Sequence, residues 1–310
     1  MAPVARVETE ELPQHDNHSG PAGDGGKRLD PRTIIAKIAA AEGLDGIAGP
    51  VASFAGRATS PKAVKNALSG TWLGHQLHPL LTDVTIGAWL SASAVDVFGG
   101  SAGAGAARGL TGLGILSAVP TAASGMSDWA ETYGPDQRVG LVHAGANTVG
   151  LALQIGSYVA RGRGNRGLGG ALSLTALGIT AAAGYLGGHL VYSRGVGVSH
   201  TAFEHRSDDW TDVGGADALE QDQPLRVDAG GVPVVVVQTG DGLFALSATC
   251  THAGGPLDEG ELVDGCLKCP WHQSMFRLSD GGVERGPAAE PQPCWQARIA
   301  EGRLQVRAAD

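Results

Sequence analysis

The chain has 310 residues, of which 43% are hydrophobic and 17% are charged, and its formal net charge is −9. This length is sufficient for two domains, and the negative charge argues against a nucleic-acid partner. The four cysteines all follow residue 249 and are too few to form the disulfide framework of a protein of this size.

The first 30 residues combine Pro, Gly, His and charged residues without a periodic apolar pattern, which predicts disorder. Short helix-compatible pieces, broken at Gly and Pro, continue to about residue 70. We therefore predict that residues 1–70 are partly disordered and partly helical. No apolar signal stretch or twin-arginine motif follows Met1, so we do not expect a cleaved export signal.

Four apolar segments then follow within residues 71–193, and each has nearly the roughly 18–25 residues that span a bilayer. They cover residues 80–98, 109–126, 139–160 and 168–192. Their Gly, Ala, Ser and Thr residues suit close packing of helices in lipid. Buried helices of a soluble protein are the alternative, but four such segments in succession are difficult to house in a soluble fold. We therefore predict a four-helix transmembrane bundle, in contact with lipid, in a multi-pass protein of the cell membrane.

The pattern changes to β after a linker at residues 194–209. The stretch VPVVVVQTGDGLFALS at 232–247 has two apolar runs around a Thr-Gly-Asp-Gly turn, which predicts a hairpin. Further short strands are predicted near 262–268, 274–278, 294–299 and 303–307, separated by Gly, Pro and Asp. The expected fold is multidomain: an all-α bundle followed by a small all-β domain at residues 210–310.

Two short motifs in the β region have the composition of a metal site. Cys250-x-His252 is followed, after sixteen residues, by Cys269-x-x-His272. A Cys₂His₂ zinc site is one possibility, but its like ligands are usually paired in sequence. Here each loop supplies one sulfur and one nitrogen. This pattern favours a binuclear cluster with Cys250 and Cys269 on one iron and His252 and His272 on the other.

The surrounding residues closely resemble the Rieske iron–sulfur domain family over residues 210–309. The resemblance rests on Cys-Thr-His, Gly-Gly-Pro-Leu, Cys-Pro-Trp-His and the Gly-Pro pair at 286–287. It implies a [2Fe–2S] cluster and an electron-transfer role.

Several positions depart from the respiratory Rieske proteins. Gly255 and Trp271 replace the two cysteines of their disulfide, Phe276 replaces a tyrosine, and Gln273 replaces the usual glycine. Ser274 matches. The pattern is nearer to ferredoxin-type and oxygenase-type Rieske domains. The remaining cysteines, at 266 and 294, are expected to be structural.

The stretch beginning TWLGHQLHP at residue 71 resembles a bacterial membrane-domain family of unknown function (DUF2231-like), which is sometimes fused to a Rieske domain. Four histidines are predicted to lie near the membrane face that carries the β-domain. We predict that His143 and His189, with His78 as a substitute, bind haem b or quinol, while His75 is more exposed. Histidines that reach toward lipid headgroups, or that bind a non-haem metal, are the alternatives.

The combined features predict a membrane-anchored electron-transfer protein that connects a membrane donor with a redox partner protein or a quinone. A redox-sensing membrane protein or a ferredoxin-like component of an oxygenase system is the alternative. A complete Rieske oxygenase would need a second iron site with two histidines and a carboxylate, and no histidine follows His272. The positive-inside rule weakly favours chain ends outside the cell. Because iron–sulfur clusters are normally assembled in the cytoplasm, we nevertheless expect a cytoplasmic Rieske domain.

Overall fold

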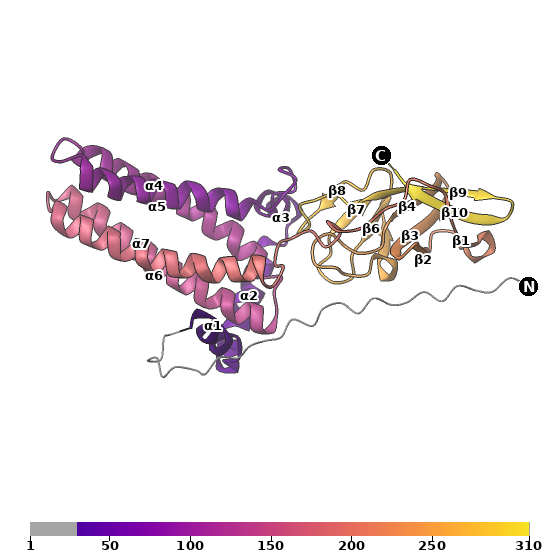
Figure 1. The fold of residues 1–310 in the computed structure, drawn as a ribbon, viewed down its shortest axis with the longest axis horizontal. Coiled ribbons are helices and arrows are strands. Elements are labelled where there is room, and N and C mark those ends of the chain that lie inside the picture. The colour runs from indigo at the N-terminus through magenta and orange to yellow at the C-terminus, as the bar shows by residue number, and fades with distance from the viewer. Residues whose placement is uncertain (1–29, 310) are drawn as a thin grey trace, which may run out of the picture.

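The computed structural model describes residues 30–309, so the predicted N-terminal disorder lies outside the described residues. Figure 1 shows an elongated molecule with a bundle of long helices at one end and a β-rich domain at the other. The two parts meet near α3 and the end of α7. This order, helices first and strands second, confirms the predicted succession of an all-α and a β-rich part.

Seven α-helices form the N-terminal part of the described chain. Three of them are short: α1 (Pro31–Ala39), α2 (Asp45–Thr59) and α3 (Lys62–Ser69). Four are long: α4 (Leu77–Phe98), α5 (Ala104–Trp129), α6 (Gly134–Gly162) and α7 (Arg166–Tyr192). The long helices contain the four predicted segments and extend beyond them. Helix α6 starts five residues early because Pro135, in its first turn, is compatible with the start of a helix.

Helix α4 packs along α5, and α6 packs along α7, so the long helices form two antiparallel hairpins (Figure 1). The short helices cover the end of this bundle that faces the β-domain. Helix α1 contacts α6, whereas α2 and α3 contact α5. The short helices therefore belong to the helical domain and do not form a separate unit.

Ten strands form two antiparallel sheets in the C-terminal part. The larger sheet has the order β1-β10-β9-β4-β3-β2, with β1 (Thr211–Gly215), β2 (Pro224–Ala229), β3 (Val232–Thr239), β4 (Gly242–Ser247), β9 (Cys294–Ala300) and β10 (Arg303–Ala308). The smaller sheet has the order β5-β6-β7-β8, with β5 (Glu261–Val263), β6 (Cys266–Lys268), β7 (Met275–Arg277) and β8 (Val283–Arg285). Short 3₁₀ helices lie at Glu42–Leu44, Ala216–Ala218 and Leu257–Glu259.

The hairpin predicted at 232–247 is formed by β3 and β4, which pair from Val234 with Ser247 to Thr239 with Gly242. The four consecutive valines of β3 are buried because the strand contributes to two cores. Val235 and Val237 pack with Leu246 in one core, and Val234 and Val236 pack on the other side. A strand that is buried on both faces has a continuous run of apolar residues in its sequence.

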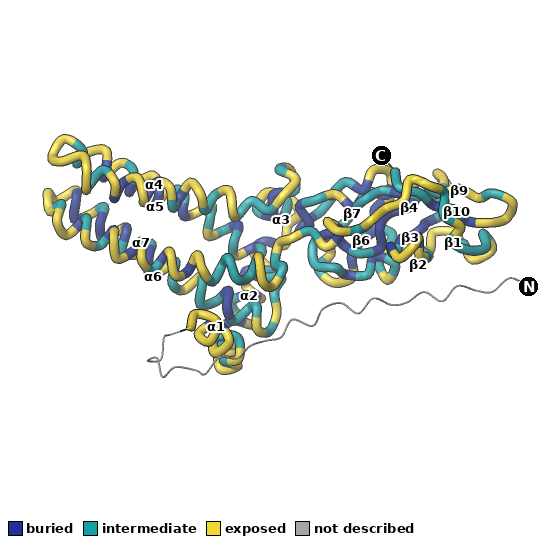
Figure 2. Tube along the Cα trace, viewed as in Figure 1, coloured by how far each residue is buried: buried dark blue, intermediate teal, exposed yellow. Residues whose placement is uncertain are grey.

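The long helices bury many polar side chains together with alanines, and they expose many large apolar side chains. Figure 2 shows many exposed positions on their outer surfaces. Buried polar residues of the bundle include Ser93, Thr111, Ser124, Gln154, Ser157, Ser173 and Thr180. Exposed apolar residues include Leu90, Val97, Leu113, Leu116, Val119, Val149 and Leu174. Large exposed apolar areas on a monomer mark surfaces that contact a protein or a membrane.

Two of the long helices, α4 and α7, are long and apolar enough to cross a membrane. This differs from the four equivalent spans that we expected. The average hydropathy of α5 and α6 is reduced by Gly, Ser and Thr and by polar residues such as Asn147 and Gln154. In the structure, Gln154 lies in the interior, where its amide oxygen accepts a hydrogen bond from Ser173 at 3.1 Å.

A buried ion pair joins the two hairpins at the end of the bundle far from the β-domain. The guanidinium of Arg161 binds the two carboxylate oxygens of Asp96 at 2.6 and 2.5 Å. The Arg161 side chain is 2% exposed and that of Asp96 is 17% exposed. Gly169 makes room for the arginine, since a Cβ at this position would lie 2.6 Å from Arg161 Cγ.

We predict that Asp96→Asn destabilises the helical domain, because it leaves a buried guanidinium without its counter-charge. Loss of one partner of a buried pair costs about 3–5 kcal/mol. Thermal unfolding of the full chain in detergent, followed by circular dichroism, measures the effect. Asp212→Asn is the matched control, since Asp212 pairs with Arg303 on the exposed surface of the β-domain. Equal unfolding temperatures for the two variants would contradict the prediction.

Candidate metal centre

The Cys250–His252 loop follows β4, and two backbone hydrogen bonds close it. The Cys250 N–H donates to Gly255 O at 2.9 Å, and the Gly254 N–H donates to Cys250 O at 2.9 Å. Gly254 has a φ of 76°, in the left-handed region that favours glycine. The loop is also held from outside, because the Thr251 N–H donates to the buried Gln292 side chain at 3.1 Å.

The Cys269–His272 loop connects β6 and β7 and repeats the same closure. The Cys269 N–H donates to Ser274 O at 2.8 Å, and the Gln273 N–H donates to Cys269 O at 3.2 Å. Gln273, four positions after the cysteine like Gly254, has a φ of 65°. The substitution of glycine by glutamine therefore keeps the turn, at the roughly 1–2 kcal/mol that a left-handed conformation costs an L-residue.

These two loops bring the four predicted ligands together. The rings of His252 and His272 lie 5.0 Å apart between centroids at an interplanar angle of 82°. The thiols of Cys250 and Cys269 are hydrogen-bonded to each other, and both residues are 1% exposed. Gly255 must lack a side chain, since a Cβ there would lie 2.9 Å from Cys269 Sγ.

The backbone surrounds the sulfur pair with N–H donors. Those of His252 and Ala253 point to the Cys250 sulfur, and those of Trp271 and His272 point to the Cys269 sulfur. The hydrogen bond from Cys250 lowers the pKa of Cys269 to about 6. The same bond, together with burial, raises the pKa of Cys250. The lowered pKa of Cys269 favours the thiolate, which is the form of cysteine that binds metals.

The imidazoles are in the form that a metal requires. Burial, reinforced by the neighbouring His272, lowers the pKa of His252 to about 3. Burial also lowers the pKa of His272. The Nδ1 atom of His252 is buried and has no hydrogen-bond partner in the structure. An unsatisfied buried nitrogen is costly unless it binds something, so this atom fits a metal ligand.

The donor set fits a two-iron cluster better than a single ion. The sulfurs form one pair and the imidazoles another. This grouping is the one that a binuclear site requires, with one pair on each iron.

The third side of the site is the loop after β8. Ala288 and Ala289 are buried, and the Ala288 N–H donates to the Ser274 hydroxyl oxygen at 3.0 Å. Phe276 is fully buried in the same core as Cys250 and Cys269. Cys266 and Cys294 are free, like the two loop cysteines. Burial raises the pKa of both thiols, which agrees with an unreactive structural role.

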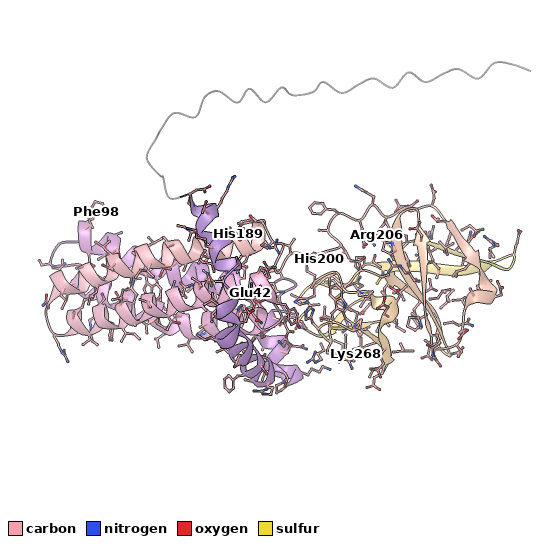
Figure 3. The ribbon with its side chains drawn as sticks, turned by 90° about the horizontal axis from the view of Figure 1, so that it is seen from below. Glu42, Phe98, His189, His200, Arg206 and Lys268 are labelled. Atoms are coloured by element: carbon pink, nitrogen blue, oxygen red, sulfur yellow. The ribbon has the colours of Figure 1, made fainter. Side chains whose placement is uncertain are left out.

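Residues of the helical domain also contact the site, and the sequence did not reveal them. The ring of Tyr133, in the turn between α5 and α6, stacks on His272 with centroids 5.8 Å apart at 20°. Figure 3 shows His200, from the 194–209 linker, at the junction of the two domains. A Cβ on Gly254 would lie 3.2 Å from His200 Nδ1. An aromatic residue in a turn after a long helix has no local pattern that could have identified it.

The histidines of the helical domain are placed differently from the predicted pairing. His78 and His143 form a pair across the bundle, with centroids 6.4 Å apart. His189 lies one turn from the end of α7 and contacts neither ring in the described structure. His75 is exposed and bonds to Gln76 O at 3.0 Å. The structure therefore places His78, the predicted substitute, beside His143.

Comparisons with known proteins agree with both halves of the chain. Residues 209–296 match the Rieske [2Fe–2S] domain, and residues 74–200 match a family described as predicted membrane protein (DUF2231). The ferredoxin subunit of anthranilate 1,2-dioxygenase from Burkholderia cepacia is 35% identical over 98 residues, which cover 32% of this chain and 91% of the subunit.

Two further proteins are similar to the C-terminal part of the chain. The iron–sulfur subunit of the cytochrome b6-f complex from Gloeobacter violaceus is 37% identical over 65 residues, covering 20% of this chain and 33% of the subunit. A solved complex of the reduced oxygenase and oxidized ferredoxin of carbazole 1,9a-dioxygenase includes a chain that is 28% identical, with a TM-score of 0.30. That match covers 33% of this chain and 94% of the solved one. The protein belongs to the Rieske [2Fe–2S] family and carries a DUF2231 membrane-protein domain before its Rieske domain.

Proposed function

We propose that this protein is a membrane-anchored electron carrier that connects a donor in the membrane with a redox partner protein. The observation that carries the proposal is the convergence of two Cys/His loops into a sulfur pair and an imidazole pair. Cys250 and Cys269 would bind one iron, and His252 and His272 the other. A bound [2Fe–2S] cluster supplies one-electron transfer, and four backbone N–H groups directed at the sulfurs stabilise added negative charge there.

Membrane insertion is supported by the distribution of polar and apolar side chains in the bundle. Its interior holds hydroxyl, amide and imidazole groups, while Leu, Val and Ile side chains cover much of its exterior. Water would solvate this exterior poorly, whereas lipid tails match it. The match to a predicted membrane-protein family and the two helices with spanning length point the same way.

The membrane donor is best placed at the His78–His143 pair. Each ring is oriented by a backbone carbonyl, since His78 Nδ1 bonds to Thr121 O at 2.9 Å and His143 Nδ1 to Ala183 O at 2.7 Å. These contacts put the proton on Nδ1 and leave Nε2 as an acceptor. Glycines make room for both rings, because Cβ atoms on Gly125 and Gly187 would lie 2.6 and 3.1 Å from their Cε1 atoms.

A quinol fits this pair better than haem b. The Nε2 atom of His78 makes no hydrogen bond within residues 30–309, so it is free to accept one from a quinol hydroxyl. The Nε2 atom of His143 already accepts a hydrogen bond from Asn147 at 3.2 Å, which a haem iron would have to displace. Coordination of haem by His143 and His189 remains the weaker proposal, because the imidazole beside His143 is that of His78.

A second candidate is a ferredoxin-like component of an oxygenase system. It is favoured by the similarity to a dioxygenase ferredoxin subunit over nine-tenths of that subunit. In this case the redox partner is a soluble oxygenase. The membrane donor and the cytoplasmic position proposed below are compatible with both candidates.

We predict that the purified full-length protein contains two irons and two sulfides and gives the rhombic EPR signal of a histidine-ligated cluster. Cys269→Ala and His272→Ala should abolish the signal, because each removes a proposed ligand. Cys266→Ala and Cys294→Ala are matched controls and should retain it. Stoichiometric zinc without iron after anaerobic purification would contradict the assignment.

The Rieske domain is predicted to lie on the cytoplasmic side. A protease should remove a C-terminal tag in inverted vesicles but not in intact cells, because the two preparations expose opposite membrane faces. A tag inserted between α4 and α5, at residues 99–103, should show the opposite accessibility. Cleavage of the C-terminal tag in intact cells would place the domain outside.

Quinol binding is predicted to depend on the imidazole pair. His78→Ala should weaken binding of a short-chain quinol by roughly 5- to 10-fold, the value of one hydrogen bond. Calorimetric titration of the protein in lipid nanodiscs measures the affinity, with His75→Ala as the control from the exposed end of the same segment. Unchanged affinity in His78→Ala would exclude this site. A b-type spectrum lost in His143→Ala would identify haem as its ligand instead.

A further inference from the structure

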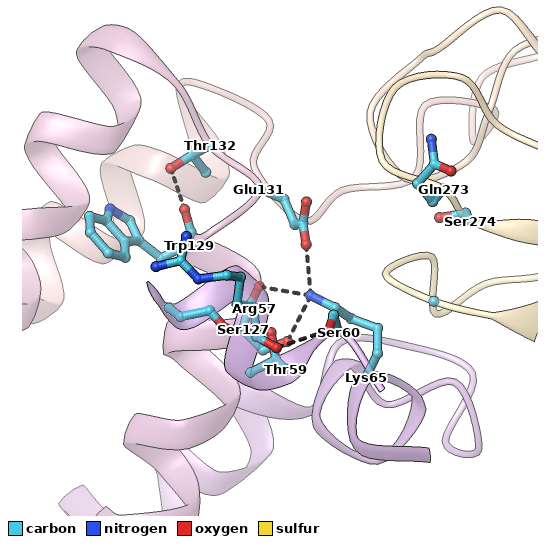
Figure 4. Close-up of polar contacts among 12 residues, drawn as sticks. Arg57, Thr59, Ser60, Lys65, Ser127, Trp129, Glu131, Thr132, Gln273 and Ser274 are labelled. Atoms are coloured by element: carbon cyan, nitrogen blue, oxygen red, sulfur yellow. Dashed lines mark hydrogen bonds and ion pairs between the residues drawn. The ribbon is translucent and has the colours of Figure 1, made fainter. Parts of the chain in front are cut away.

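The histidine edge of the β-domain lies against one end of the helical domain. The contacting part of the helical domain, which we name the cap, consists of α3 (Lys62–Ser69) and the turn at residues 130–133. Figure 4 shows Lys65 bound to Glu131 and Ser127 of the helical domain, with the loop that carries Gln273 and Ser274 beside them. The cap is therefore positioned directly opposite the second Cys/His loop.

The cap is a rigid part of the helical domain because α3 is fixed to α5 by a buried lysine. Lys65, which is 2% exposed, bonds through Nζ to Glu131 Oε1 at 2.7 Å and to Ser127 Oγ at 3.2 Å. A buried ammonium that lost these partners would be strongly destabilising. Contacts between α3 and the Rieske domain are therefore contacts between two domains.

Asn66 holds the cap to the loop that covers the metal centre. Its side-chain amide donates to Glu284 O at 3.1 Å, and its carbonyl oxygen accepts from the Gly286 N–H at 2.9 Å. The Asn66 side chain thus bonds to the backbone of the residues immediately before and after Arg285. Two surface contacts add to this attachment: Lys62 forms an ion pair with Glu284, and Arg285 Nη2 donates to Ser60 O at 3.3 Å.

The same arrangement covers the two imidazoles from the helical side. Tyr133 stacks on one face of His272. His252 borders a cavity of about 10 Å³, enough for about one water molecule, which is also lined by Gln76, Val198 and Ser199. Gln76 precedes α4, two residues before His78. Gln76 therefore connects the cavity at His252 with the start of the helix that carries His78.

We propose that the docking partner of the histidine edge is the helical domain of the same chain, held by Asn66 and Lys62 and contacted by Tyr133. This inference rests on the proposed function and identifies the route of electron exchange. In the docked arrangement, the cap would lie between the bound cluster and the membrane site, and electrons would cross it. A separate soluble redox protein reaches the histidines only after the cap is released.

The test uses the full-length protein in nanodiscs and compares two reductants. One is a short-chain quinol, which gives one electron to each of two protein molecules and releases two protons on becoming quinone. The other is a reduced soluble ferredoxin, which gives one electron. Hydrogen–deuterium exchange of α3 and of residues 250–255 and 269–274 reports docking independently of electron transfer.

Asn66→Leu removes both amide hydrogen bonds with little change in volume. It should shift the docking equilibrium toward release by roughly five- to hundredfold, the factor that two net hydrogen bonds represent. We expect faster exchange in α3 and both loops, slower reduction by quinol and faster reduction by ferredoxin. Tyr133→Ala should also slow reduction of the protein by quinol, because it removes the ring that stacks on His272.

Lys62→Glu is a second variant that keeps the test decisive if Asn66→Leu folds poorly, because Lys62 is exposed. Arg303→Glu is the matched control, since it reverses a charge in an exposed pair away from the cap. Iron and sulfide content is measured in every variant, so loss of the cluster, which would overturn the proposed function, is recognised separately. With the cluster present, unchanged deuterium exchange, or equal changes with both reductants, would overturn the docking proposal.

Discussion

The two Cys/His loops are each closed by backbone hydrogen bonds from residues four and five positions apart, and this closure determines where their donors point. In both loops the cysteine N–H bonds to the carbonyl five residues later, while its own carbonyl accepts from the residue four positions later. The backbone must then turn through a left-handed residue, Gly254 in one loop and Gln273 in the other. The sheets and the loop after β8 hold these two similar units face to face, so two sulfurs and two imidazoles meet.

The helical domain follows a different constraint, since its polar groups face inward. Ser and Thr hydroxyls, a glutamine amide and two imidazoles bond to neighbouring helices, and glycines provide the space that these contacts need. Gly125 and Gly187 face the imidazoles, while Gly169 faces Arg161. Such packing suits helices surrounded by lipid, where burial of apolar surface drives association weakly and small residues permit close contact. The end of the helical domain that meets the Rieske domain carries polar side chains, among them Lys62 and Asn66.

Much of this organisation could be predicted from local patterns. The hairpin at 232–247 follows from two apolar runs around a Gly-Asp turn, and the resemblance to a Rieske domain follows from residues close together in sequence. The contacts between domains could not be predicted in this way. Tyr133 and Asn66 contact residues of the other domain more than 60 positions away, and no local pattern in their own segments indicates these partners. The pairing of His78 with His143 depends on which helices are neighbours. The lengths of the helices and the depth of each histidine in the membrane do not determine which helices are neighbours.

The local closure of the two loops has a consequence for how the metal centre is assembled. Each loop is formed by contacts between residues no more than five apart, so each can adopt its shape soon after its flanking strands pair. The hydrogen bonds that shape the two halves of the site come from the protein's own backbone. In zinc fingers, by contrast, metal binding supplies the free energy that orders the chain. A substitution that prevents the left-handed turn in either loop would therefore displace a sulfur and an imidazole together.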